Sequence, residues 1–92
     1  MALQSFRLKF IGLVQGVGFR QYTYRIARQF GATGFVVNNI DGSVSAEIQL
    51  NSKLVHNLLA ELKRGPSHSI VCEFTKTEIN LLDNDNEFKI IR

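Results

Sequence analysis

The sequence predicts an α+β sandwich, in which an antiparallel sheet of four strands plus a short fifth strand carries two helices on one face. Several short segments alternate apolar and polar residues, as half-buried strands do, and two longer segments repeat apolar residues at helical spacing. In chain order these segments read β-α-β-β-α-β, followed by a short last strand. Because the alternating strands leave one face of the sheet polar, we expect both helices on the other face.

The first strand and the first helix are separated by a glycine-rich segment. The strand is expected from Phe6 to about Val14, since apolar residues at positions 6, 8 and 10 alternate with two basic residues. The helix is expected over residues 21–30, where apolar residues recur at helical spacing, and Gly31 stands just past its end.

The next two strands form a predicted hairpin. Residues 34–39 and 44–50 have the composition of strands, and the Asp-Gly pair that ends at Gly42 is typical of a tight turn. A β-α-β crossover makes the first two strands parallel, and the hairpin makes the third antiparallel to the second. The third strand can then lie between the other two, which is the ferredoxin-like sandwich. We expect one such domain over residues 1–92.

The second helix has signals at both of its ends. Either Asn51 or Ser52 is expected to cap its start, because both side chains can accept a hydrogen bond from a backbone N–H group. Leucine and valine residues between positions 54 and 62 form its apolar stripe, and the Gly-Pro pair at 65–66 is expected to end it.

The fourth strand is expected around Ile70, Cys72 and Phe74, whose alternation places all three toward the core. On this interpretation Cys72 is a buried and inert thiol. Lys76 and Ile79 disturb the alternation, so a bulge or register shift is expected near them.

The last part of the chain is interpreted as a polar turn at 83–86 followed by a short strand at 88–91. Acidic residues at positions 83, 85 and 87 have some of the spacing of a calcium loop, but Phe88 stands where that loop requires glycine. His56 and His68 are not spaced as a metal-binding pair. We therefore expect no metal and no other cofactor.

Composition and charge exclude several functional classes. The net charge is +3, but the basic residues are scattered rather than clustered, so no nucleic-acid partner is expected. No apolar run approaches the length of a membrane helix, and the N-terminus does not resemble a secretory signal, so no membrane association is expected. A single cysteine excludes an internal disulfide and is compatible with a reducing cytoplasmic location.

The segment "VQGVGFR" at 14–20 contains the strongest candidate site. If the first two strands are parallel, this loop and Asn38 leave the same edge of the sheet, about 10 Å apart across the third strand. The glycines allow backbone N–H groups at the start of a helix to converge on an anion. Arg20 adds a guanidinium that matches phosphate or carboxylate oxygens. A plain strand-to-helix turn with a surface arginine remains the alternative interpretation of this spacing.

Two motifs resemble signatures of the acylphosphatase family. The first is "GLVQGVGFR" at 12–20, and the second, less specific, is "GFVVNNIDGSV" at 34–44. The separation of the motifs, the order of the elements and the Gly-Pro pair at 65–66 also match, so the resemblance covers essentially the whole chain. Val37 departs from the pattern, where the family usually has a longer basic or polar residue, and Leu50 stands where it usually has glycine.

The resemblance implies that the protein hydrolyses acyl phosphates, the mixed anhydrides of a carboxylic acid and phosphoric acid. It implies that Arg20 binds the phosphoryl group and that Asn38 orients the attacking water, without metal or cofactor. It also implies a small monomeric cytoplasmic enzyme that is inhibited competitively by its product, inorganic phosphate. The backbone N–H groups that the resemblance assigns to the phosphoryl group belong to Gln15, Gly16, Val17, Gly18, Phe19 and Arg20.

Two other functions are compatible with the same predicted fold. One is a carbamoyl-phosphate-handling module, like the acylphosphatase-like domain of hydrogenase-maturation carbamoyltransferases, although no further domain is expected in 92 residues. The other is a non-catalytic anion- or RNA-binding domain. RNA-binding versions expose aromatic residues on the central strands, whereas Phe6 and Phe10 are expected in the core here.

Overall fold

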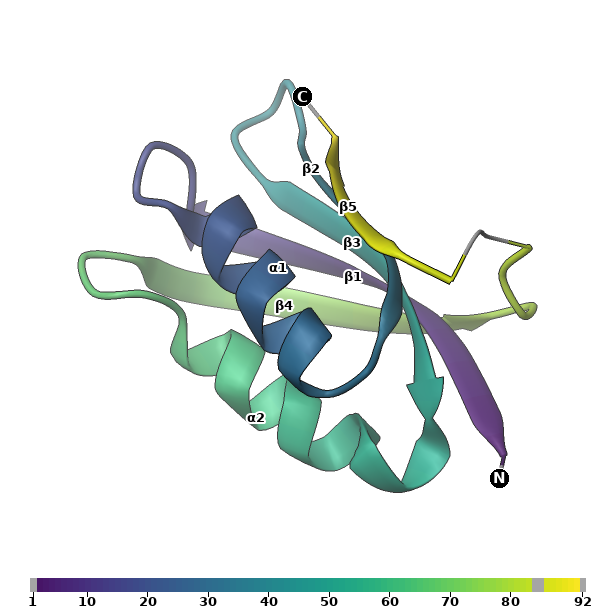
Figure 1. The fold of residues 1–92 in the computed structure, drawn as a ribbon. Coiled ribbons are helices and arrows are strands. Elements are labelled where there is room, and N and C mark those ends of the chain that lie inside the picture. The colour runs from purple at the N-terminus through teal and green to yellow at the C-terminus, as the bar shows by residue number, and fades with distance from the viewer. Residues whose placement is uncertain (1, 84–85, 92) are drawn as a thin grey trace.

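One sheet carries both helices on the same face, in the part of the chain that the structure describes (Figure 1). The structure is a computed structural model, and it describes residues 2–83 and 86–91. In chain order the elements are β1 (Leu3–Leu13), α1 (Phe19–Gln29), β2 (Thr33–Asn38), β3 (Val44–Asn51), a short 3₁₀ turn η1 (Ser52–Leu54), α2 (Val55–Arg64), β4 (Ile70–Ile79) and β5 (Phe88–Ile91).

The strands are ordered β4-β1-β3-β2-β5 across the sheet. β3 lies between β1 and β2 and is antiparallel to both, so β1 and β2 run in the same direction. The predicted ferredoxin-like arrangement is therefore confirmed. β5 adds to the free side of β2 in parallel. As a result, the C-terminal ends of β1, β2 and β5 all lie at one edge of the sheet, and the β1–α1 loop leaves from that edge.

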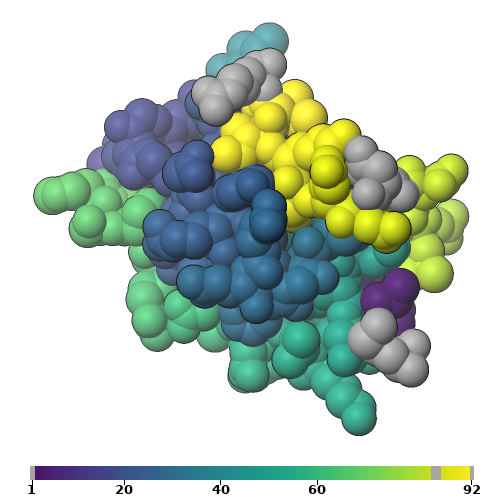
Figure 2. Space-filling model, in the orientation of Figure 1, coloured from purple at the N-terminus to yellow at the C-terminus, as the bar shows by residue number. Residues whose placement is uncertain are grey.

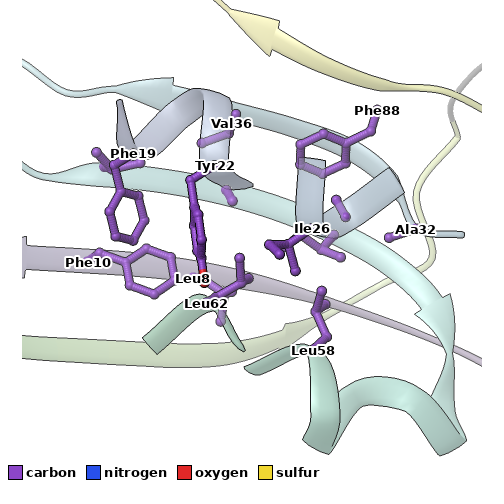
Figure 3. Close-up of a cluster of buried hydrophobic side chains, with 14 of the residues drawn as sticks. Leu8, Phe10, Phe19, Tyr22, Ile26, Ala32, Val36, Leu58, Leu62 and Phe88 are labelled. Carbon is purple, nitrogen blue, oxygen red and sulfur yellow. The ribbon is translucent and has the colours of Figure 1, made fainter. Parts of the chain in front are cut away.

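The hydrophobic core fills the space between the sheet and the two helices (Figure 3). The alternation along β1 buries Phe6, Leu8 and Phe10 completely on the helix side, as predicted. The apolar stripe of α1 packs against this face of the sheet. Tyr22 of this helix donates a hydrogen bond of 2.7 Å to the carbonyl oxygen of Glu61 in α2. The other fully enclosed side chains of the core include Phe19, Val36, Val44, Ile48, Leu58 and Leu62.

The interpretation of Cys72 as a buried core residue is wrong. Between Ile11 and Gly12 of β1, the pairing with β4 shifts by one residue, so that Cys72 has no partner in the ladder. This bulge reverses the alternation at the start of β4, where Val71 packs against the core and Cys72 is exposed. Beyond the bulge, Phe74 packs against the core as predicted. Ile70, also predicted to face inward, is 58% exposed. The bulge therefore lies at Cys72 rather than near Lys76 and Ile79, where it was expected.

The helix boundaries differ slightly from those expected. α1 begins at Phe19, two positions before the expected start, because the chain enters the helix directly from the glycine loop. Asn51 is the residue that caps, since its Oδ1 accepts from the backbone N–H of Lys53 at 3.0 Å and opens the 3₁₀ turn before α2. The polar turn expected at 83–86 and the acidic position 85 lie partly outside the described residues.

Candidate active site

The loop between β1 and α1 turns the chain through two left-handed glycines. Gly16 has φ 75° and Gly18 has φ 80°, dihedrals that residues with a side chain rarely adopt. A Cβ atom at either position would meet open space, so backbone conformation, and not crowding, favours glycine here. The loop can consequently bend directly into α1 and leave room above its backbone for a ligand.

The start of α1 has the properties of an anion site. Gly18 is the N-cap residue, so no side chain accepts a hydrogen bond from the first N–H groups of the helix. The first turn also contains no acidic residue that would compete with an anion. Unsatisfied N–H groups and the helix dipole both favour negative charge at such an end.

Phe19 fixes the position of this helix start. Its ring is 1% exposed and lies 5.0 Å from the ring of Phe10, centroid to centroid. Because Phe10 sits in the middle of the core, the contact anchors the exit of the loop to β1. The next residue, Arg20, is thereby held at the edge of the sheet.

The side chain of Arg20 is half-buried and reaches β5. Its Nη1 donates a hydrogen bond of 3.2 Å to the carbonyl oxygen of Ile91. In the space-filling view the atoms of β5 (yellow) lie directly beside those of α1 (blue) (Figure 2). A guanidinium has five N–H donors, so one contact with a carbonyl leaves others that can face an anion.

Asn38 ends β2 on the helix side of the sheet, the same side as Val36. Its Oδ1 atom is buried and has no hydrogen-bond partner among the described residues. A buried amide oxygen without a partner costs free energy, of the order of 1–3 kcal/mol, unless water or a ligand donates to it. Asn38 therefore has the unused hydrogen-bonding capacity expected of a residue that binds a solvent molecule or substrate.

A single open pocket of about 250 Å³ brings these groups together. Arg20 and Asn38 both line it, together with the two glycines of the loop, as the parallel arrangement of β1 and β2 predicts. Its size suits a phosphoryl group and a water molecule better than a large ligand. The lining residues are Val14, Gly16, Gly18, Phe19, Arg20, Gln21, Asn38 and Ile90.

Some groups at the site were missed by sequence reasoning. Ile90 closes the pocket from β5, and no local pattern indicates that β5 lies beside β2. Gln15 and Val17, assigned to the phosphoryl group through their N–H groups, do not line the pocket. The side chain of Gln15 instead contacts the turn between β2 and β3.

That turn, residues 39–43, is held by its own polar side chains. Asn39 Nδ2 donates to the hydroxyl oxygens of Ser43 and Ser45 at 2.8 and 2.7 Å. Asp41 accepts from the backbone N–H and the hydroxyl of Ser43, and Lys9 lies 3.1 Å from its other oxygen. The hydrogen bonds from Ser43, followed by Lys9, lower the pKa of Asp41 from 3.8 to about 2.

The described residues contain neither a cluster of metal-binding side chains nor a helix that could span a membrane. Within residues 2–83 and 86–91, no three side chains of His, Cys, Asp or Glu are grouped closely enough to hold a metal ion. In the same residues neither helix has the length and apolar character needed to span a bilayer.

The fold and the pocket together define a small ferredoxin-like protein with an open pocket at a strand-to-helix loop. The family model described as Acylphosphatase matches residues 6–90. An acylphosphatase of Clostridium acetobutylicum is 34% identical over 89 residues, which are 97% of this chain and 98% of that protein. The chain belongs to the acylphosphatase family.

Solved structures agree with this assignment. The crystal structure of acylphosphatase from Bacillus subtilis superimposes with a TM-score of 0.92 at 28% identity, covering 99% of this chain and all of that one. Full-length HypF, solved in its phosphate- and nucleotide-bound form, contains a similar region with a TM-score of 0.91 at 30% identity. This chain covers only 12% of HypF but nearly the whole length of the acylphosphatases, so the small enzymes are the better comparison.

Proposed function

We propose that the protein is an acylphosphatase that hydrolyses the carboxyl-phosphate anhydride bond of small acyl phosphates by direct attack of water. The proposal is supported chiefly by one observation: the glycine loop, Arg20 and the unpartnered Oδ1 of Asn38 line the same pocket. Membership of the acylphosphatase family supports the same substrate class. No cofactor is needed in this mechanism.

The phosphoryl group binds at the loop. Its oxygens accept hydrogen bonds from backbone N–H groups of the loop 15–20, chiefly the four residues that line the pocket (Gly16, Gly18, Phe19 and Arg20), and from the guanidinium of Arg20. These donors are fixed in place before the substrate arrives, because the loop continues into α1 and Phe19 is anchored in the core. Preorganised donors stabilise the charge that develops on the equatorial oxygens in the transition state.

Asn38 orients the water. Its Oδ1 accepts a hydrogen bond from the water, whose oxygen attacks phosphorus. The new P–O bond forms as the bond between phosphorus and the acyl oxygen breaks, and the electron pair leaves with the carboxylate. The proton of the water passes to a phosphoryl oxygen, so the products are a carboxylate and inorganic phosphate.

The chemistry does not require a general acid. Carboxylic acids have pKa values near 4, so a carboxylate leaves as a stable anion at neutral pH. Positioning and charge stabilisation then account for most of the acceleration that phosphoryl transfer needs. The reaction class is therefore hydrolysis of an acid anhydride.

We also propose that the enzyme acts as a monomer in the cytoplasm and that inorganic phosphate inhibits it competitively. Arg20, Asn38 and the loop glycines line one pocket of a single chain, so the proposed mechanism requires no residue from a second copy. Phosphate carries the same oxygens that the loop is proposed to bind in the substrate.

The test compares benzoyl phosphate with p-nitrophenyl phosphate, using purified protein with and without excess EDTA. We expect turnover of benzoyl phosphate at an unchanged rate in EDTA, and little turnover of the monoester, whose leaving group lacks the carboxylate. Phosphate binding without turnover of benzoyl phosphate would identify a non-catalytic anion-binding domain instead. Loss of activity in EDTA, restored by a divalent ion, would contradict the metal-free mechanism.

A further inference from the structure

Gln15 lies at the start of the phosphate loop, but its side chain points away from the pocket to the turn that follows Asn38. Its Nε2 donates to the carbonyl oxygen of Asn39 at 2.7 Å and to that of Ser43 at 2.9 Å. Both neighbours are carbonyl oxygens, which only accept hydrogen bonds, so the amide nitrogen must be the atom that faces them. Both N–H groups of one amide are thus used on a single turn.

The two carbonyls that Gln15 contacts are also the ones that close this turn. The backbone N–H of Asn39 donates to the Ser43 carbonyl at 2.9 Å, and that of Gly42 donates to the Asn39 carbonyl at 3.2 Å. Gln15 therefore contacts the turn where its backbone is already fixed. A movement of the β1–α1 loop relative to the turn would break both bonds to Gln15.

We propose that Gln15 is a positioning residue for the reaction, because it sets the distance between the phosphate loop and Asn38. The inference rests on the proposed function. The loop presents the phosphoryl group, and Asn38, which directly precedes the contacted turn, presents the water. The loop follows β1 and Asn38 ends β2, and β3 lies between these two strands. The side chain of Gln15 links the two halves of the site across this gap.

The expected effect follows from this geometry. Without the link, the loop still binds phosphate through its own backbone, but the water and phosphorus lose their alignment. A misplacement of about 1 Å in a reacting group can cost on the order of 10²-fold in rate. A positioning role therefore lowers kcat and leaves phosphate affinity nearly unchanged.

The experiment uses Gln15→Met, which keeps the length of the side chain and removes both donors. We expect kcat for benzoyl phosphate to fall roughly 10- to 100-fold, while the inhibition constant of inorganic phosphate stays within about threefold. Amide hydrogen exchange at Asn39 and Gly42 should accelerate, a readout that needs no turnover. Wild-type kcat, or a matched loss of phosphate binding and kcat, would overturn the positioning role.

Gln49→Met is the matched control. Gln49 also uses its side chain to link two segments, since its Oε1 accepts from the Ser5 hydroxyl and from the backbone N–H of Leu82. It pairs with Thr33, at the opposite end of β2 from Asn38. We expect a comparable loss of thermal stability and an unchanged kcat. An equal loss of kcat in both variants would mean that Gln15 acts only through overall stability.

Gln15→Glu gives a second measurement, the pH dependence of kcat relative to wild type. This ratio would not change with pH if Gln15 had a merely structural role. The carboxylate cannot donate to the two carbonyls, so activity should be low at neutral pH. Its protonated form can donate one hydrogen bond, and the kcat of this variant relative to wild type should therefore rise as the pH falls. A pH-independent ratio contradicts the proposal. If the wild type does not turn over benzoyl phosphate, the proposed function fails. Separately, an unchanged hydrogen exchange at Asn39 and Gly42 in Gln15→Met would show that Gln15 does not hold the β2–β3 turn, and would overturn this proposal.

Discussion

Arg20 at the start of α1 donates a hydrogen bond of 3.2 Å from Nη1 to the carbonyl oxygen of Ile91 in β5. The contact joins the proposed phosphate-binding side chain to a strand that is far away in sequence. It directs the guanidinium along the C-terminal edge of the sheet, where Asn38 also ends its strand. The orientation of Arg20 thus depends on the pairing of β5 with β2 as well as on the loop.

Replacement of Arg20 is expected to impair both phosphate binding and turnover. Arg20→Ala should reduce kcat/KM by at least about 10²-fold, by analogy with the removal of one transition-state donor. Arg20→Lys should recover little, because an ammonium cannot contact the Ile91 carbonyl and two phosphoryl oxygens in the planar geometry of a guanidinium. Steady-state kinetics with benzoyl phosphate and phosphate titrations measure both effects. Near-normal kinetics in Arg20→Ala would make it a surface arginine.

Asn38→Ala should separate catalysis from binding. We expect a large fall in kcat, because the water loses its acceptor, while the inhibition constant of inorganic phosphate stays within a few-fold of wild type. Asn38→Asp keeps the acceptor but adds a negative charge beside an anionic substrate, so it should not restore turnover.

Thermal unfolding distinguishes this effect from loss of the fold. Because the Oδ1 of Asn38 is buried without a partner among the described residues, its removal should not lower the melting temperature appreciably. A well-folded Asn38→Ala protein with normal kcat would exclude the water-orienting role.

The acid stability of the β2–β3 turn should depend on Asp41. Its pKa is lowered from 3.8 to about 2, so the carboxylate form stabilises the folded protein above the unfolded pKa. This contribution is lost as the pH falls from about 4 through 2. The melting temperature of wild type should exceed that of Asp41→Asn at pH 5, and the difference should shrink over that window.

The causes of the lowered pKa of Asp41 can be ranked by measuring that pKa directly by NMR in variants of its neighbours. The hydrogen bonds from Ser43 lower it more than Lys9 does. Ser43→Ala should therefore raise the pKa of Asp41 more than Lys9→Met does. The opposite order would show that the ion pair, and not the turn, sets the charge of this residue.

Local patterns in the sequence were sufficient for the fold and for the main pair of site residues. The alternation along β1 and the spacing in α1 are set by burial within each element, so they are visible in the chain itself. The order of these elements makes β1 and β2 parallel, and that alone places Arg20 and Asn38 at one edge. Both line the pocket, although their roles in the reaction remain predictions.

The features that could not be predicted depend on contacts between distant segments. The side-chain bonds of Gln15 to the β2–β3 turn require the exact separation of two loops, which no spacing in one strand encodes. Ile90 reaches the pocket only because β5 pairs with β2. The bulge at Cys72 is a property of the ladder between β1 and β4, so the alternation in β4 by itself gave the wrong face for Ile70 and Cys72.

The accessibility of Cys72 provides the last prediction. In the folded protein the thiol lies at the surface, beside Lys63 and Glu73 at a shallow depression. It should therefore react with one equivalent of a disulfide reagent such as DTNB without denaturant, at a rate near that of the unfolded chain. A thiol that reacts only after unfolding would restore the interpretation of Cys72 as a core residue.

Stability measurements test the same bulge independently. Cys72→Ser should change the free energy of unfolding by no more than about 0.5 kcal/mol, as is usual for surface positions. Val71→Ser is the matched control, because Val71 packs against the core, and it should cost on the order of 1 kcal/mol or more. Urea denaturation of both variants gives the comparison. If Cys72→Ser is the more destabilising change, the alternation at the start of β4 is not reversed and the register shift opposite Gly12 is absent.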